Sequence, residues 1–203
     1  MKFDIHIHTS YSDGAGSPED VIKQAKKIGL DGIAITDHDN FNGFFIAKKY
    51  GSENFKIIPG VEITSLEGHI LCLDATPAVE PLTPAVEVIE KIHASGGIAI
   101  AAHPYDVFRG GVGDLIRKLK FDGIEVKNGR TIMSSKNVED IKRIADEMHI
   151  TKTGGSDAHS LLEIGNIQLE VNEDPIEAIK KGNVEVITGD KFKRKIDYVK
   201  SFF

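Results

Sequence analysis

The sequence predicts an α/β protein built around one hydrophobic core. Short apolar runs rich in Ile and Val alternate with amphipathic stretches along all 203 residues, an order typical of a parallel sheet covered by helices. With 40% hydrophobic residues, the chain is long enough for one sizeable core and too short for two comfortable domains. We therefore expect a single domain over residues 1–203. The alternation alone does not distinguish an open sheet from a closed barrel.

The expected strands are apolar runs bounded by Gly, Asp, Asn or Pro, at residues 3–8, 32–37, 56–64, 69–74, 98–103, 123–127, 151–154, 167–171 and 184–187. Helix signals lie between them. Four helices are expected, one from Ser17-Pro18 to about Gly29, one over 85–94 after Thr83-Pro84, one from Ser134 or Ser135 to about His149, and one from Asp174-Pro175 to Gly182.

Composition excludes several classes of function. The formal net charge of −6 makes generic binding to duplex nucleic acid unfavourable, because such binding depends on cationic neutralisation of phosphates. No run of eighteen uncharged apolar residues exists, which excludes a membrane span. The first eight residues lack the apolar run of a signal peptide, so we expect a cytoplasmic protein. The single cysteine, Cys72, lies in an apolar run and is interpreted as a small buried residue without a redox role.

The first expected strand carries Asp4, His6 and His8 on one face, because side chains two residues apart in a strand point the same way. Two neighbouring imidazoles in a protein interior each require a hydrogen-bond partner or a metal ion. Taken alone, such a His-x-His pair is a weak indication of a metal site.

The ends and edges of other strands strengthen this indication. Six of the 8 histidines lie at such positions with acids nearby, namely His6, His8, His38, His69, His103 and His159. The remaining two, His93 and His149, fall in expected helices and are interpreted as ordinary, partly exposed residues. The carboxyl ends of all strands in an α/β barrel open on one face, so this distribution favours a barrel. Imidazoles mixed with carboxylates suit Zn, Mn or Fe, and open sites of this kind are typical of hydrolases.

These segments resemble the PHP (polymerase and histidinol phosphatase) family. The matching motifs, in order, are His6-Ile7-His8-Thr9, Ser12-Asp13-Gly14, Thr36-Asp37-His38-Asp39, Pro59-Gly60-Val61-Glu62, His69, His103-Pro104 and Gly155-Ser156-Asp157-Ala158-His159. The resemblance implies a distorted (β/α)7 TIM-like barrel with two or three divalent metals. Its ligand-bearing core would be residues 1–160, completed by a C-terminal strand and helix in residues 161–203.

The resemblance also assigns ligands. One metal would be held by His6, His8, Glu62 and Asp157. Glu62 would bridge to a second metal, held also by His69 and His103. A third would be held by Asp13, His38 and His159.

Among family branches, the chain is most similar to the stand-alone phosphoesterases of nucleotide or short-oligonucleotide phosphates. Glu62 and Asp157 would then be catalytic through the metals, which activate a hydroxide, and Arg130 would contact the phosphate. The chain lacks room for the helical insertion that often caps the site in this branch. The exact substrate, the native metal and the oligomeric state are therefore left open.

Three alternative functions remain. An amidohydrolase that cleaves C–N bonds also uses His-x-His on its first strand, although that class usually bridges its metals with a modified lysine and has a longer chain. A non-catalytic, metal-stabilised subunit would be expected to have lost ligands. Histidinol phosphate phosphatase would use the same chemistry as the favoured function.

Several neighbouring residues have weaker expectations. Asp4 and Asp37 are expected either to orient ligand histidines or to make structural hydrogen bonds, with equal weight. Asp39 is expected to cap the next helix. Arg109 is expected to be a solvated loop residue in preference to a substrate contact. Ordinary packing is favoured over stacking on a base for three aromatic residues, Tyr11, Phe44 and Tyr105.

Overall fold

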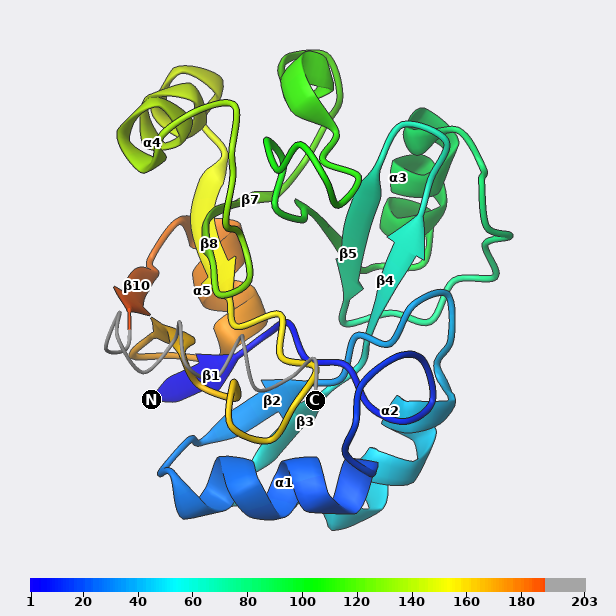
Figure 1. Ribbon diagram of the computed structural model, residues 1–203, viewed down its shortest axis with the longest axis vertical. Helices are drawn as coiled ribbons and strands as arrows, with labels where there is room; N and C mark the ends of the chain where they lie inside the picture. The colour runs from blue at the N-terminus through cyan, green and yellow to red at the C-terminus, as the bar shows by residue number, and fades with distance from the viewer. Residues whose placement is uncertain (189–203) are drawn as a thin grey trace.

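A computed structural model describes residues 1–188 as two five-stranded sheets (Figure 1). The first sheet has the order β10-β9-β1-β2-β3, with bounds Glu185–Thr188, Ile167–Glu170, Lys2–Asp4, Gly32–Ala34 and Lys56–Ile58. The second has the order β4-β5-β6-β7-β8, with bounds Gly60–Thr64, His69–Leu73, Ile98–Ala101, Gly123–Asn128 and Thr151–Gly155. Residues 189–203, part of the expected C-terminal completion, lie outside the described residues.

The sheets are mixed, which corrects the expectation of a wholly parallel arrangement. Strands β1, β2 and β3 are parallel, as are β6, β7 and β8. However, β4–β5, β5–β6, β1–β9 and β9–β10 are antiparallel. The run expected as one strand over 56–64 is divided at Pro59, which has no N–H to donate to a ladder. The short turn between β4 and β5 leaves no room for a helical crossover, so these two strands must be antiparallel.

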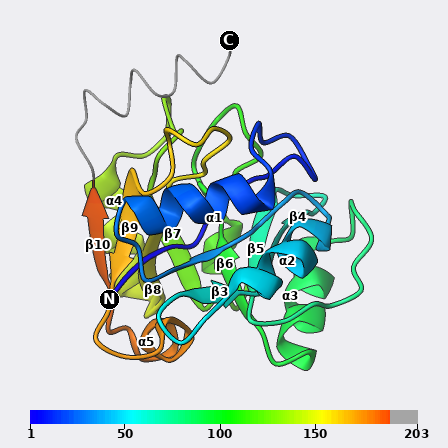
Figure 2. The ribbon, with the colours of Figure 1, turned by 90° about the horizontal axis from the view of Figure 1, so that it is seen from below.

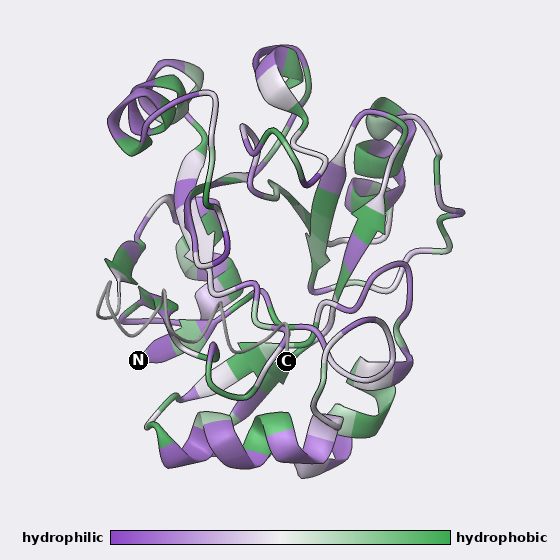
Figure 3. Cartoon of the chain, in the orientation of Figure 1, coloured by the Kyte–Doolittle hydropathy of each residue, from purple (hydrophilic) through white to green (hydrophobic). Residues whose placement is uncertain are grey.

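Helices cover the outer faces of both sheets. Helices α1 (Pro18–Lys27) and α2 (Asn42–Ala47) lie together beside β2 and β3, and a 3-10 helix, Lys48–Tyr50, follows α2 (Figure 2). Helix α3 (Ala85–Ala94) packs on β5 and β6, α4 (Val138–Met148) on β7 and β8, and α5 (Pro175–Lys181) on β8. A second 3-10 helix, Gly113–Arg117, precedes β7. Apolar residues dominate β4 and β5, whereas α1 also carries polar residues that face solvent (Figure 3).

Three of the four expected helix starts are confirmed, and one is wrong. Ser17 caps α1, α3 follows Pro84, and Asp174 caps α5. Helix α4 instead begins after Asn137, whose side chain accepts the Asp140 N–H at 2.9 Å. The serines expected to open it donate their hydroxyls to the Tyr105 carbonyl, at 3.2 and 3.4 Å, so they tie a loop in place of capping a helix.

The two sheets meet at two isolated bridges, where the chain beyond β1 and β2 pairs with the chain beyond β8 and with β4 itself. One bridge pairs Ile7 with Ala158 and the other pairs His38 with Glu62. Across residues 1–188 the strands do not close into the expected (β/α)7 barrel. The first two expected strands are also shorter than predicted, because residues beyond Asp4 and Ala34 leave their ladders to make these bridges. The bridges place the strand ends of both sheets together.

Packing agrees with several of the smaller expectations. Cys72 is fully buried, and burial raises the pKa of its thiol to about 12. Phe44 and Tyr105 are buried in hydrophobic clusters, whereas Tyr11 is 40% exposed. His149 ends α4 in a left-handed conformation. None of the helices described is both long enough and apolar enough to cross a bilayer.

Candidate metal centre

Backbone pairing at the two bridges brings distant histidines and carboxylates together. The His8 N–H donates to the Ala158 carbonyl at 2.8 Å, and the Ala158 N–H donates to the His6 carbonyl at 3.3 Å. This pairing sets His6 and His8 beside Asp157. At the other bridge the Asp39 N–H donates to the Glu62 carbonyl at 2.9 Å. The predicted ligands therefore converge because the chain pairs just beyond its regular strands.

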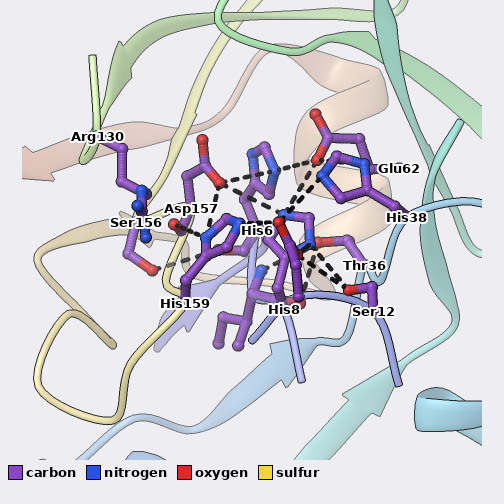
Figure 4. Close-up of polar contacts among 12 residues, drawn as sticks. His6, His8, Ser12, Thr36, His38, Glu62, Arg130, Ser156, Asp157 and His159 are labelled. Carbon is purple, nitrogen blue, oxygen red and sulfur yellow. Dashed lines mark hydrogen bonds and ion pairs between the residues drawn. The ribbon is translucent and has the colours of Figure 1, made fainter. Parts of the chain in front are cut away.

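The carboxylate of Glu62 contacts imidazoles through both of its oxygens, and Figure 4 shows dashed lines from it to neighbouring histidines. Its Oε2 is 3.0 Å from the Nε2 atoms of both His6 and His8. Its Oε1 is 3.0 Å from His69 Nδ1 and 3.0 Å from His103 Nε2. The Glu62 side chain is only 1% exposed. The two oxygens therefore face two different sets of imidazoles, as a bridging carboxylate requires.

Three groups of donor atoms are each compact enough to hold one ion. They are His6, His8, Glu62 and Asp157; His38, Glu62 and His69; and His8, Asp13, His38 and His159. The first group is the set that the resemblance assigns to one metal. The other two differ in detail, since His38 belongs to both and His8 joins the third. His103 is in none of the three groups, but it reaches the same Glu62 oxygen as His69.

The orientation of the donors fits cations better than hydrogen bonds. His8 Nε2 and His69 Nδ1 each lie 3.0 Å from a Glu62 oxygen, yet neither makes an aligned hydrogen bond to any group in the described part of the chain. A buried polar atom without a partner is costly, and such atoms at a polar cluster point to an ion or water. Imidazole nitrogens and carboxylate oxygens are suitable ligands for Zn, Mn and Fe.

The neighbouring carboxylates and imidazoles of the cluster shift one another's pKa values. Burial opposes the charged form of Glu62, but the adjacent His6 and His103 hold its pKa well below the usual value. Burial likewise opposes protonation of His8, but Asp157 and Glu62 raise its pKa to about 9. The pKa of Asp157 is lowered well below its usual value, because His6 and Arg109 outweigh the effect of burial. Without cations, protons on the imidazoles balance the buried carboxylates.

Arg109 is part of the site, which corrects its expected role as a solvated loop residue. Its Nη1 contacts Asp157 Oδ2, its Nε donates to Asp106 Oδ2 at 3.1 Å, and its Nη2 donates to Asn128 Oδ1 at 3.0 Å. The guanidinium thus occupies the outer oxygen of Asp157, while Oδ1 faces His6 and His8 at 3.5 and 3.4 Å. Sequence reasoning had only the closeness of Arg109 to His103-Pro104 as a signal.

Arg130 lies at the side of the site formed by Ser156 and Asp157, away from Glu62 and His38 (Figure 4). It lines a cavity of about 250 Å³ together with Arg109 and all of the ligand candidates except His6 and His8. Its Nη1 is 3.4 Å from Glu163 Oε1, and its side chain is 11% exposed. The predicted phosphate-contacting arginine is therefore at the cavity, and its contact with a phosphate stays a prediction.

The weaker expectations for three aspartates are now decided. The carboxylate of Asp4 accepts backbone N–H groups of His6, Ser156 and Gly165, and burial raises its pKa to about 6. The carboxylate of Asp37 accepts hydrogen bonds from Thr9 and Ser12, as the structural interpretation expects.

Asp39 does not cap α2, which corrects the third expectation. Its Oδ1 accepts the Thr64 N–H at 2.8 Å and so ties the chain after β2 to the end of β4. The backbone of Asp39 has a φ of 49°, a left-handed conformation that turns the chain away from the helix start.

The buried carboxylate of Glu125 was not assigned a role from the sequence. Glu125 on β7 is 1% exposed, and its Oε1 lies 2.9 Å from His6 Nδ1. Its position in the apolar run 123–127 gave a signal, because an acid in a buried strand requires partners. The identity of those partners depends on the tertiary fold.

The mixed α/β fold gathers imidazoles and carboxylates beside a cavity, in groups that could each hold a metal ion. The chain belongs to the PHP family. The PHP domain matches residues 4–157, and the PHP-associated region matches residues 139–184.

Individual relatives agree with this assignment. An uncharacterized protein of Methanocaldococcus jannaschii is 39% identical over 140 residues, which cover 63% of this chain and 82% of that protein. A phosphoribosyl 1,2-cyclic phosphate 1,2-diphosphodiesterase of Eggerthella lenta is 30% identical over 105 residues, 47% of this chain and 39% of that enzyme. A crystal structure from Bacteroides vulgatus, of a two-domain protein containing a predicted PHP-like metal-dependent phosphoesterase, shares the fold with a TM-score of 0.75. It is 18% identical, and the match covers 99% of this chain and 69% of that one.

The raised pKa of His8 predicts how the stability of the chelator-treated protein depends on pH. The pKa rises from 6.5 to about 9 on folding, so His8 stabilises the folded state fully below pH 6.5. This contribution is lost as the pH rises through about 9. Urea unfolding between these limits should show a larger fall in the free energy of unfolding for the wild type than for His8→Gln.

His93→Gln is the matched control, because His93 pairs with Asp122 outside the cluster. It should lose stability with pH as the wild type does. Equal losses in the wild type and His8→Gln would contradict the assignment.

Proposed function

We propose that this protein is a metal-dependent phosphoesterase that holds two or three divalent ions, Zn, Mn or Fe. The proposed ligands are His6, His8, Asp13, His38, Glu62, His69, His103, Asp157 and His159. The observation that carries the proposal is the Glu62 carboxylate, whose two oxygens each lie 3.0 Å from two imidazole nitrogens. Nitrogen and oxygen donors converging beside a cavity suit catalysis better than a closed structural site.

Divalent cations at such a site lower the pKa of water to give a nucleophile near neutral pH and polarise the phosphoryl oxygens. Glu62 holds the two donor groups together through its separate oxygens. Asp157 presents Oδ1 to His6 and His8 and keeps Oδ2 on Arg109. Histidines engaged as ligands have no lone pair left for general-base work. The chain's own contribution is therefore positioning and charge.

Arg130 is the proposed contact for the non-bridging oxygens of the phosphate. It lines the same cavity as most of the ligand candidates, and a guanidinium matches the geometry of phosphate oxygens. Positive charge there stabilises the transition state, in which negative charge is spread over the equatorial oxygens of the phosphoryl group. Arg109 is proposed to hold Asp157 in place, because its guanidinium contacts Asp157, Asp106 and Asn128.

The proposed substrate is a small phosphate ester, with a nucleotide or short-oligonucleotide phosphate favoured and histidinol phosphate as the alternative within the same chemistry. The Eggerthella lenta relative, named for a phosphodiesterase activity, supports phosphate-ester chemistry in general. We also propose that residues 1–203 form one domain, since β9 and β10 extend the sheet that contains β1.

The proposed function predicts that activity depends on metal. Purified protein should release phosphate from p-nitrophenyl phosphate or a nucleotide, Mn or Zn should stimulate this activity, and a chelator should abolish it. His103→Ala should remove most of the activity and lower the metal content, because it deletes a donor 3.0 Å from Glu62. His93→Ala, at the surface beside Asp122, serves as the matched control and should keep both.

A panel of 5′-monophosphates, 3′,5′-bisphosphates, cyclic phosphates, short oligonucleotides and histidinol phosphate would identify the substrate. Hydrolysis of none of them by fully metal-loaded protein would count against a phosphoesterase. Hydrolysis of C–N substrates instead would favour the amidohydrolase alternative.

The proposed role of Arg130 also leads to a prediction. Arg130→Ala should lower kcat/KM by about 100-fold, because it removes positive charge from the developing phosphoryl oxygens. Metal content, measured by atomic emission, should stay at the wild-type level. Arg117→Ala is the control, since Arg117 pairs with Glu147 on the surface. Loss of metal from the Arg130 variant would overturn its assignment to the phosphate.

A further inference from the structure

Glu125 connects two ligand candidates from different strand ends. Its Oε1 lies 2.9 Å from His6 Nδ1, and its Oε2 accepts the backbone N–H of His103 at 2.8 Å. Gly155 permits this approach, since a Cβ there would lie 2.3 Å from His6 Cβ and 3.0 Å from Glu125 Oε1. The contact therefore requires β7, the end of β8 and the chain after β1 to meet with no side chain at position 155.

Asn128, three residues further along β7 and beyond the register shift between Glu125 and Lys127, extends the connection. Its Nδ2 donates to Glu125 Oε2 at 2.9 Å and to Asp157 Oδ2 at 3.1 Å. Its Oδ1 accepts a hydrogen bond from Arg109 at 3.0 Å. Asn128 is 7% exposed, so these contacts are shielded from water. Through Asn128, the outer oxygen of Asp157 is fixed and Oδ1 is left to face His6 and His8.

The residues held in this way have strained backbones. His103 has a φ of 28° and Asp157 a φ of 54°, in the region that residues with side chains rarely adopt. Such conformations persist only where surrounding contacts hold them. Glu125 binds the N–H of His103, and Asn128 binds the side chain of Asp157. Glu125 and Asn128 therefore contact the two residues whose backbone conformations need support, His103 and Asp157.

We propose that Glu125 and Asn128 are positioning residues for the metal centre, and that Glu125 fixes the tautomer in which His6 presents Nε2 as a ligand. This inference rests on the metal binding in the proposed function and not on the identity of the substrate. A ligand imidazole usually donates its second N–H to a carboxylate or carbonyl, and losing that partner costs about 10- to 100-fold in metal affinity.

The isosteric Glu125→Gln variant separates this role from simple packing. Glu125 accepts three hydrogen bonds, from His6, His103 and Asn128. A glutamine whose oxygen keeps the bonds to His103 and Asn128 turns its NH2 toward His6 Nδ1. His6 must then accept at Nδ1 and carry its proton on Nε2, the nitrogen that faces Glu62. In that tautomer Nε2 cannot bind a metal.

The test uses the full chain, stripped with a chelator and titrated with zinc by isothermal calorimetry. Glu125→Gln should bind the tightest zinc about 10- to 100-fold more weakly than the wild type. Long-range ¹H–¹⁵N NMR of the zinc-treated protein should show His6 protonated at Nδ1 in the wild type and at Nε2 in the variant. Asn128→Ala should also weaken binding, but should leave His6 protonated at Nδ1.

Asp122→Asn is the matched control. Asp122 Oδ2 also meets an imidazole and a backbone amide, His93 Nε2 and the Ala99 N–H, both at 2.8 Å and outside the cluster. This variant should bind zinc as the wild type does.

If Glu125→Gln retains wild-type affinity and the Nδ1 proton, the inference is wrong while the proposed function stands. If the wild type binds neither zinc nor manganese nor iron in such titrations, the proposed function itself fails. Should Glu125→Gln not fold, the wild-type spectrum still decides, since a proton on His6 Nε2 in the zinc-loaded protein would overturn the assignment.

Discussion

The structure depends on one buried carboxylate surrounded by imidazoles. Removing Glu62 from water is costly unless its charge is compensated, and four ring nitrogens at 3.0 Å from its two oxygens provide the compensation. Protons or cations must accompany those nitrogens, because Arg109 pairs with Asp157 and leaves the charge of Glu62 to the imidazoles. The buried negative charge of the site therefore requires positive charge close to it, and divalent cations would supply that charge.

The fold builds this core by ending its regular strands early. Beyond Asp4 and Ala34 the chain leaves the ladders and pairs across the gap between the two sheets, at Ile7–Ala158 and His38–Glu62. Irregular backbone near the ligands, such as the positive φ angles of His103 and Asp157, then points side chains inward that a regular strand would direct elsewhere. Buried hydrogen bonds to Asp4, Asp37 and Glu125 hold these segments in place.

Sequence patterns predicted the elements well and their connection less well. Strand positions and the caps at Ser17 and Asp174 follow from local rules, so they could be predicted. The split at Pro59 and the antiparallel pairs depend on how a short link directs the chain into the other sheet, which apolar periodicity does not encode. The barrel was expected from the histidines at strand ends and from the family resemblance, whereas the structure has two sheets.

In the site, too, some residues could be predicted from the sequence and others could not. The histidines were indicated by their positions at strand ends, the resemblance to the PHP family implied the full ligand set, and the structure brings these candidates together. Arg109 and Glu125 were not assigned, because a loop arginine and a strand glutamate look ordinary until tertiary contacts place them beside Asp157 and His6. Residues that position ligands act through contacts distant in the sequence, so they need the structure.

Diffraction from crystals of the zinc-loaded protein, recorded on both sides of the zinc absorption edge, tests the central claim most directly. Anomalous peaks should lie about 2.0 to 2.2 Å from imidazole nitrogens and carboxylate oxygens. At least two of these peaks should share Glu62. Peaks confined to the surface, with none within coordination distance of Glu62, would contradict the account.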